Sequence, residues 1–260
     1  MSARFGRSFR PEAFRKATVL TSVIGDVHTI ADVVAAMRAI ETALPENDGV
    51  RWFNVLYRRV TEAVDADESL WQDWPFLQKF DVAFAKLYFD AIISWESSPA
   101  TAPRAWRPLF QARGNNKILP LQFALAGMNA HINNDLVIAL DRIARSEQQY
   151  PSRDGQRYRD FQRVNDVLER VEVELQPLLS TGVIAAIDGV LGDLDTILAM
   201  WKVRHARDTA WTNGEVLWNL RAAPHVRSEY LTGLDRMVGF AGRGLLAPLP
   251  AVAKAPSRIV

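Results

Sequence analysis

The 260-residue sequence contains no cysteine. Disulfides, thiolate nucleophiles and cysteine-ligated zinc sites are therefore excluded. An excess of one charge is also missing, because 31 lysines and arginines balance 30 aspartates and glutamates to leave a formal net charge of +1. A nucleic-acid surface needs a strong basic excess, so no nucleic-acid partner is expected. The absence of cysteine fits a reducing cytoplasm, which is the expected location.

Familiar cofactor and catalytic motifs are absent as well. The sequence has no P-loop, no GxGxxG fingerprint, no GxSxG elbow and no HExxH motif. The paired ExxH motifs of ferritin-like di-iron bundles are also missing. No nucleotide or redox cofactor is therefore predicted. Residues 1–16 carry several arginines but lack the apolar stretch and cleavage site of a secretory signal.

One segment has the length of a membrane span. Residues 118–140 are mostly apolar, with Asp135 as their single formal charge. Six side chains nevertheless make the segment too polar for lipid: Gln122, Asn129, His131, Asn133, Asn134 and Asp135. We therefore predict a buried core helix here and no membrane partner.

Helical periodicity runs through almost the whole chain. Thr29 and Asp32 have the spacing of a capping box ahead of an amphipathic helix that ends before Pro45. Pro75 suits the first turn of an aromatic-rich helix. Strand alternation and internal repeats are missing. We predict a single-domain all-α helical bundle of about seven to nine helices, with a buried central helix at about residues 118–145.

The ends of the chain differ in composition from its middle. Residues 1–20 are predicted to form a basic N-terminal arm, and residues 241–260 an Ala/Pro-rich C-terminal arm. Residues 21–240 are then the single all-α domain. Within it, residues 182–221 predict one or two helices, with Gly189 and Gly192 as candidate break points.

The segment GMNAHINNDL, residues 127–136, places polar side chains on the most apolar helix of the chain. At about 100° per residue, His131, Asn134 and Asp135 share one sector of the helix, and Asn129 and Asn133 lie almost opposite. A helix that is apolar all round is buried, and an unsatisfied buried polar group costs about 1–3 kcal/mol. Two hydrogen-bonded clusters are expected, or one cluster and a solvent-filled cavity.

His131 and Asp135 are four residues apart, which lets their side chains interact. Three interpretations remain open. The pair is a buried network that fixes helix packing, or His131 is an acid–base group oriented by Asp135. In the third interpretation, both residues are ligands of zinc or iron together with a group such as Asp208 from a facing helix.

A second set of polar residues continues the apolar stripe of residues 194–201. Such a stripe either leaves the core or lines a polar pocket, and the return of Trp211 on this side favours a pocket. There, Arg204 or Arg207 could clamp an anionic or carbonyl group. Alternatively, the segment RHARD, residues 204–208, is a solvated and salt-bridged helix face.

Four segments resemble a bacterial family of single-domain helical proteins that is known only as a domain of unknown function. They are FNVLYRRVT (53–61), AWRPLF (105–110), ALAGMNAHINNDL (124–136) and ARDTAWTNGEVLWNLR (206–221). The similarity covers about residues 30–222, and AGMNAHINxDL is its most specific element. By motif position, the resemblance implies a site made of Trp106, Asn129, His131, Asn133, Asp135, Arg207 and Trp211. It leaves out His28, His205 and His225, which favours a lone His–Asp pair over a multi-histidine metal site.

The leading functional hypothesis is a cofactor-independent acid–base enzyme in bacterial specialised metabolism. It would act on a small, largely apolar molecule as a cyclase, dehydratase or isomerase. His131 would transfer the proton and Asp135 would orient it, while Asn129 or Asn133 would stabilise an oxyanion and Arg207 would act as an electrostatic clamp. The expected substrate-binding residues are Trp106, Asp208, Trp211 and Glu215.

Two alternatives belong to other classes of protein. One is a metal-dependent hydrolase or oxygenase that holds Zn or Fe on His131, Asp135 and Asp208. The other is a non-enzymatic helical protein that binds a ligand or acts as a scaffold. The sequence predicts no oligomeric state.

Overall fold

The computed structural model describes residues 20–179 and 203–248. Short polar side chains begin the first helices. Thr29 and Asp32 form the predicted capping box at the start of α2 (Ile30–Ala43). Asp48 caps α3 (Gly49–Asp65), and Asp73 caps α4 (Trp74–Ser97) by accepting from the backbone N–H of Phe76 at 3.1 Å.

Nine α-helices and no strand lie in the described part of the chain, which confirms the predicted all-α class. A π-helical turn, His131–Asp135, joins α6 to α7. The remaining α-helices are α5 (Arg107–Ala112), α6 (Pro120–Ala130), α7 (Leu136–Glu147), α8 (Gln156–Leu179), α10 (Val203–Asn219) and α11 (Pro224–Leu245). Residues 1–19 of the predicted arm (1–20) and residues 182–202 of the predicted helical segment (182–221) lie outside the described residues.

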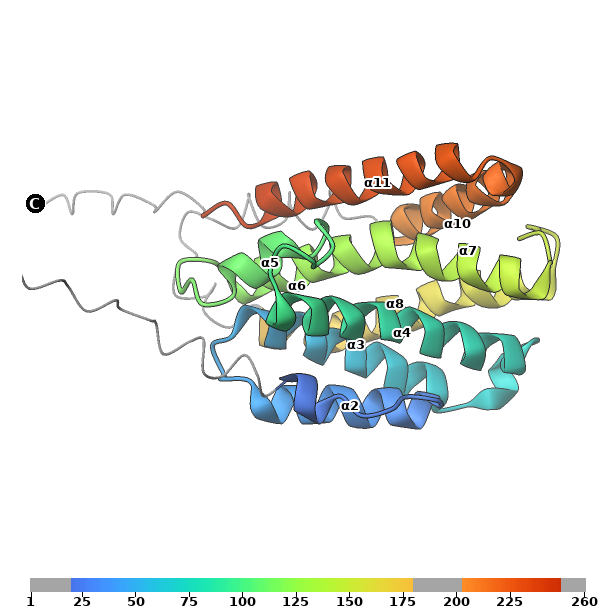
Figure 1. The fold of residues 1–260 in the computed structure, drawn as a ribbon. Coiled ribbons are helices and arrows are strands. Elements are labelled where there is room, and N and C mark those ends of the chain that lie inside the picture. The colour runs from blue at the N-terminus through green and yellow to red at the C-terminus, as the bar shows by residue number, and fades with distance from the viewer. Residues whose placement is uncertain (1–19, 180–202, 249–260) are drawn as a thin grey trace, which may run out of the picture.

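The predicted central helix is α6, the π turn and α7, which follow one another as a single rod through the middle of the bundle (Figure 1). α10 and α11 pack on one side of this rod, and α3 and α4 on the other, with α2 beyond α3. Almost every residue of α6 is buried. No helix of the described segments is both long and apolar enough to cross a membrane.

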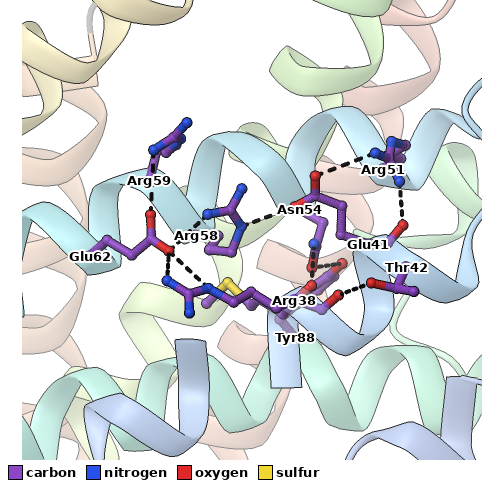
Figure 2. Close-up of polar contacts among 10 residues, drawn as sticks. Arg38, Glu41, Thr42, Arg51, Asn54, Arg58, Arg59, Glu62 and Tyr88 are labelled. Atoms are coloured by element: carbon purple, nitrogen blue, oxygen red, sulfur yellow. Dashed lines mark hydrogen bonds and ion pairs between the residues drawn. The ribbon is translucent and has the colours of Figure 1, made fainter. Parts of the chain in front are cut away.

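An ion-pair network ties α2 to α3 at the edge of the bundle (Figure 2). Glu41 accepts hydrogen bonds from the side chains of Arg51 and Arg58, while Glu62 accepts from Arg58 and from Arg38. Glu41 of α2 thus joins two arginines of α3, and Glu62 of α3 joins one arginine from each helix. Pairs of this kind on a half-exposed surface contribute little singly, so their role is to fix the register of α2 on α3.

The predicted boundary at residue 240 falls inside α11, which continues to Leu245. Gly242 and Leu246 are buried, and the Gln122 side chain donates to the carbonyls of Leu245 and Ala247, both at 2.8 Å. Residues 241–248 therefore belong to the bundle, which corrects the predicted arm. The prediction was based on the composition of residues 241–260 as a whole, but alanine and proline are frequent only after Leu246, the last buried residue among those described.

α11 offers a test of how closely the bundle is packed. A Cβ on Gly239 would overlap the backbone carbonyl of Arg104, whereas a Cβ on Gly233 of the same helix would meet nothing within 4 Å. Gly239→Ala is expected to lower the free energy of unfolding by about 2 kcal/mol, because backbone must move to admit the methyl group. Gly233→Ala is expected to raise it by about 0.5–1 kcal/mol. Urea unfolding of both variants checks this, and equal effects would contradict the packing of α11 on the loop before α5.

Candidate functional site

The central rod changes its helical geometry at the polar motif. Residues His131–Asp135, which read HINND, form a π turn between two α-helices. The π-helix is rare, and its single-turn bulges occur frequently at functional sites. The widened turn contains the histidine, two asparagines and the aspartate of the motif.

Asp135 is the centre of a buried hydrogen-bonded cluster. Its Oδ2 accepts from the indole Nε1 of Trp106 at 2.9 Å and lies 3.1 Å from Nδ1 of His131. Its Oδ1 accepts from Nδ2 of Asn134 at 2.9 Å. These side chains are all at most 3 % exposed. This is the first of the two predicted clusters, and it holds the His131 ring in a fixed orientation.

Aromatic rings surround the imidazole of His131. The Phe84 ring stacks on it at a centroid distance of 3.6 Å and an angle of 10°, and the Tyr57 ring meets it edge-on at 4.3 Å. Burial lowers the pKa of His131, against the opposing effect of the hydrogen bond to Asp135. A neutral ring follows. Because Asp135 offers only acceptor oxygens here, we assign the proton to Nδ1.

The other ring nitrogen has nothing to bond to. Nε2 of His131 is buried and has no hydrogen-bond partner among the residues that the structure describes. In the assigned tautomer Nε2 carries a lone pair, which is the basic site of the ring.

A cavity of about 70 Å³ adjoins His131. Its wall is almost entirely apolar and comes from α3, α4, α6, the π turn, α8 and α10. Such a volume holds a few water molecules or a small organic group. Its aliphatic and aromatic lining includes Leu56, Val60, Phe76, Phe80, Met128 and Phe161.

Polar atoms without partners gather at this cavity. Seven side-chain nitrogen or oxygen atoms are buried without a hydrogen bond in the described segments. Three of them belong to the cavity-lining residues Asp81, His131 and Arg207, while the Tyr57 hydroxyl at the same cavity interacts with Thr61. Native proteins leave few such atoms, so three around one cavity call for a ligand or ordered water as partner.

Asp81 brings a carboxyl group to the cavity from α4. Leu77 precedes it by four residues, and Phe84 and Ala85 follow it by three and four residues. Residues at these spacings share one face of a helix, so Asp81 lies on the buried stripe of α4. The residue is partly exposed, but its Oδ2 is buried and without a partner in residues 20–179 and 203–248. Burial, with a smaller contribution from the charge of Asp65, raises the pKa of Asp81 to about 7. At neutral pH this carboxyl is about half protonated.

Arg207 brings the opposite charge from α10. It is 4 % exposed, its Nη2 donates to the backbone carbonyl of Phe161 at 2.8 Å, and its guanidinium lies 4.2 Å from the centroid of the Phe161 ring. Burial lowers the pKa of Arg207 to about 9, and the neighbouring charge of Arg204 acts in the same direction. Arg204 itself is exposed and pairs with Asp166 and Glu169. Arg204 thus lies on a salt-bridged helix face, as one interpretation of RHARD predicts, whereas Arg207 lines the cavity and its role as a clamp stays a prediction.

Tyr88 supports the site from α4. Its hydroxyl donates to Oδ1 of Asn54 at 3.3 Å, and Nδ2 of Asn54 donates to the Met37 carbonyl at 2.8 Å (Figure 2). The Tyr88 ring lies 5.1 Å from the Trp106 ring, between centroids. The α2–α3 pair is thereby connected to the indole that holds Asp135.

Asn129 and Asn133 form the second predicted cluster, on the other side of the rod. Asn133 Nδ2 donates to Asn129 Oδ1 at 3.1 Å, and Asn129 Nδ2 donates to the Val238 carbonyl of α11 at 3.0 Å. Neither residue lines the cavity at His131. Their contacts fix α11 against the central rod.

The structure does not place the other expected substrate-binding residues at this cavity. Asp208 accepts from Arg153 at 2.9 Å and from the Tyr158 hydroxyl at 2.7 Å, and Glu215 pairs with the same arginine. Trp211 is buried beside them and donates from Nε1 to the Pro151 carbonyl at 3.0 Å. These contacts join α10 to the loop before α8.

The ligands of the metal hypothesis are likewise not assembled around His131. Asp208 is engaged with Arg153 and Tyr158 rather than with the His131–Asp135 pair. Across the described residues, no group of three His, Cys, Asp or Glu side chains is arranged to hold a metal ion.

Sequence reasoning missed Asp81 and Tyr57. A signal for Asp81 was present, since it is the one acid on the apolar stripe of an aromatic-rich helix. Tyr57 lies within FNVLYRRVT, one of the segments that carry the resemblance. Neither signal showed that these two residues lie at the same cavity as His131, because that depends on packing between helices that are distant in the sequence.

No curated protein and no solved structure matches the chain. Residues 30–248 match the Family of unknown function (DUF5995), and the chain therefore belongs to this family.

Proposed function

We propose that the protein is a cytoplasmic, cofactor-independent acid–base enzyme that acts on a small, largely apolar organic molecule in the cavity at His131. The observation that carries this proposal is that His131 lines the cavity and has a buried, unpartnered Nε2, while its Nδ1 is anchored on Asp135. A histidine oriented through one nitrogen and free at the other is the arrangement of a general base. A role in bacterial specialised metabolism is part of the same proposal.

His131 removes a proton from the substrate. Its neutral ring offers the Nε2 lone pair to the cavity, and Asp135 stabilises the imidazolium that forms. Trp106 and Asn134 hold Asp135 in place by their two hydrogen bonds. His131 itself lines the cavity in which the substrate would bind.

Asp81 returns a proton. With a pKa of about 7, its carboxyl is protonated in a large share of molecules at neutral pH. One proton passes from substrate carbon to His131 and another passes from Asp81 to substrate oxygen or to a second carbon. The net change is an isomerisation, and with an internal nucleophile or a leaving hydroxyl it becomes a cyclisation or a dehydration. Proton transfer through water from the imidazolium of His131 to the carboxylate of Asp81 then restores both groups.

Arg207 binds an oxygen-bearing group of the substrate and so orients the molecule in the cavity. The negative charge that develops when His131 removes a proton is taken up by protonation from Asp81, because the amides of Asn129 and Asn133, from which we expected an oxyanion role, are occupied on the α11 side. A guanidinium in an apolar cavity makes stronger electrostatic contacts than it would in water.

Deuterium exchange tests the proposal without knowledge of the net reaction. Short-chain ketones and 2-oxo acids are incubated with the protein in D₂O, and their C–H signals are followed by ¹H NMR. Exchange beside the carbonyl, at a rate proportional to protein concentration, is the expected result. Compounds that bind without exchanging would instead indicate the non-enzymatic ligand-binding protein. Elemental analysis of the purified protein tests the metal alternative separately, since stoichiometric zinc or iron would displace a metal-free mechanism.

The pH dependence of exchange is expected to be a narrow bell. The base must be neutral, so the rate falls as pH drops through the pKa of His131, which burial holds below 6.5. The acid must be protonated, so the rate also falls as pH rises through about 7, the pKa of Asp81. Rate constants measured between pH 4 and pH 9 and ¹⁵N NMR of His131 check the two limbs. A rate that keeps rising above pH 8 would exclude Asp81 as the acid.

A further inference from the structure

We propose that the ligand of this cavity carries a single carboxylate group, which binds to the guanidinium of Arg207. This inference rests on the proposed function only in taking the cavity at His131 as the binding site. It adds the substrate class, a small carboxylic acid with an apolar body.

The contacts of Arg207 leave its charge without a counter-ion. Its Nη2 bonds to a neutral carbonyl, that of Phe161, and its Nε is buried and has no partner in the part of the chain that the structure describes. Within those same residues no carboxylate lies within ion-pair distance of it, whereas Arg204, one turn earlier, has two. Arg207 lines the cavity.

An arginine in this state lacks the partner that buried arginines ordinarily have. Burying an unpaired charge is costly, and an ion pair with good hydrogen-bond geometry offsets the cost. The lowered pKa of Arg207 has the same cause. An anionic ligand would supply the missing counter-charge. The guanidinium of Arg207 is already removed from water in the free protein, so ligand binding would not have to remove its hydration again.

The lining of the cavity limits the anion to one charge. Arg207 is the single lysine or arginine among its described lining residues, and Asp81 adds a negative charge whenever it is ionised. A phosphate or a dicarboxylate would therefore carry more negative charge than the wall can balance. A planar carboxylate matches the guanidinium, and the volume of about 70 Å³ suits a short chain.

Butanoate and butanamide give a direct test, because they share a skeleton and differ in charge. Each is titrated into the full-length protein at pH 7 and followed by saturation-transfer NMR and calorimetry. Butanoate is expected to bind at least about tenfold more tightly, the size expected of a charge-assisted hydrogen bond. Arg207→Met is expected to remove this preference. Arg204→Met, the same change at an exposed and paired arginine of the same helix, is expected to keep it.

Several results would overturn the inference. They are equal binding of acid and amide, no binding of either, or an equal loss of preference in both arginine variants. The comparison of acid with amide uses the unaltered protein, so it stands even if Arg207→Met fails to fold. Tight butanoate binding without any deuterium exchange in the ketone panel would leave this inference in place and remove the proposed function. Exchange at the same rate in compounds with and without a carboxylate would keep the proposed function and remove this inference.

Discussion

Replacing His131 with glutamine is expected to slow deuterium exchange by about 10³-fold, the size expected of a lost general base. Glutamine has a similar length and can still donate a hydrogen bond to Asp135. It has no basic lone pair at the position of Nε2, so the proton acceptor is lost while the cluster around Asp135 is largely kept. The measurement is the second-order exchange constant of the variant, relative to the native protein, at the pH optimum.

The stability of His131→Gln decides how that result is interpreted. His131 stacks on Phe84 and packs against Tyr57, so the variant loses some aromatic contact. A loss of about 1–2 kcal/mol in the free energy of unfolding is expected, which leaves the protein folded. The matched control is His225→Gln, the same change at an exposed histidine in the first turn of α11. His225→Gln is expected to change neither the exchange rate nor the free energy of unfolding. Exchange that persists in His131→Gln at the native rate would refute a role for this histidine as the base.

The helix starts and the central rod were predictable from the sequence because their signals are local. Thr29 and Asp32 lie within one turn of each other, and the polar faces of residues 127–136 follow from helical periodicity alone. Each cluster contains a hydrogen bond within one turn, from His131 to Asp135 in the first and from Asn133 to Asn129 in the second. Such contacts depend little on the rest of the fold.

Contacts between distant segments could not be predicted in the same way. Asn129 meets a carbonyl that lies 109 residues further along the chain, so its role as a packing contact is invisible in the motif. Arg204 and Arg207 are about 60° apart on a helical wheel, yet one is exposed and the other buried. The difference depends on how α10 is rotated about its axis, which packing against α7 and α8 determines.

Asp81 is expected to make the native protein less stable as the pH rises. Its carboxyl has a pKa of about 7 in the fold, against 3.8 when it is free in water. The folded state therefore binds the proton more tightly, and the free energy of unfolding falls as pH increases from about 4 to about 7. Below this window both states are protonated and the cost vanishes. Above it the buried charge is present in full.

Asp81→Asn removes this titration while keeping the shape of the side chain. The variant is expected to exceed the native protein by about 2 kcal/mol at pH 8 and to match it near pH 4. This is less than the whole shift would give, because the carboxyl is partly exposed to water. Urea unfolding of both proteins at pH 4, 5.5 and 8 measures the difference. Asp26→Asn, at an exposed aspartate before α2, is the control and is expected to show no such trend.

Exchange kinetics on the same variant then separate the two explanations for an unpaired carboxyl in an apolar wall. If Asp81 supplies a proton, Asp81→Asn gains stability at pH 8 and loses exchange activity by about 10²-fold, with the alkaline limb removed from its pH profile. A gain in stability together with a loss of activity would mean that Asp81 is retained for its function although its charge destabilises the fold. If the variant gains stability and exchanges at the native rate, Asp81 is not the acid, and His131 with Arg207 must account for the chemistry without it.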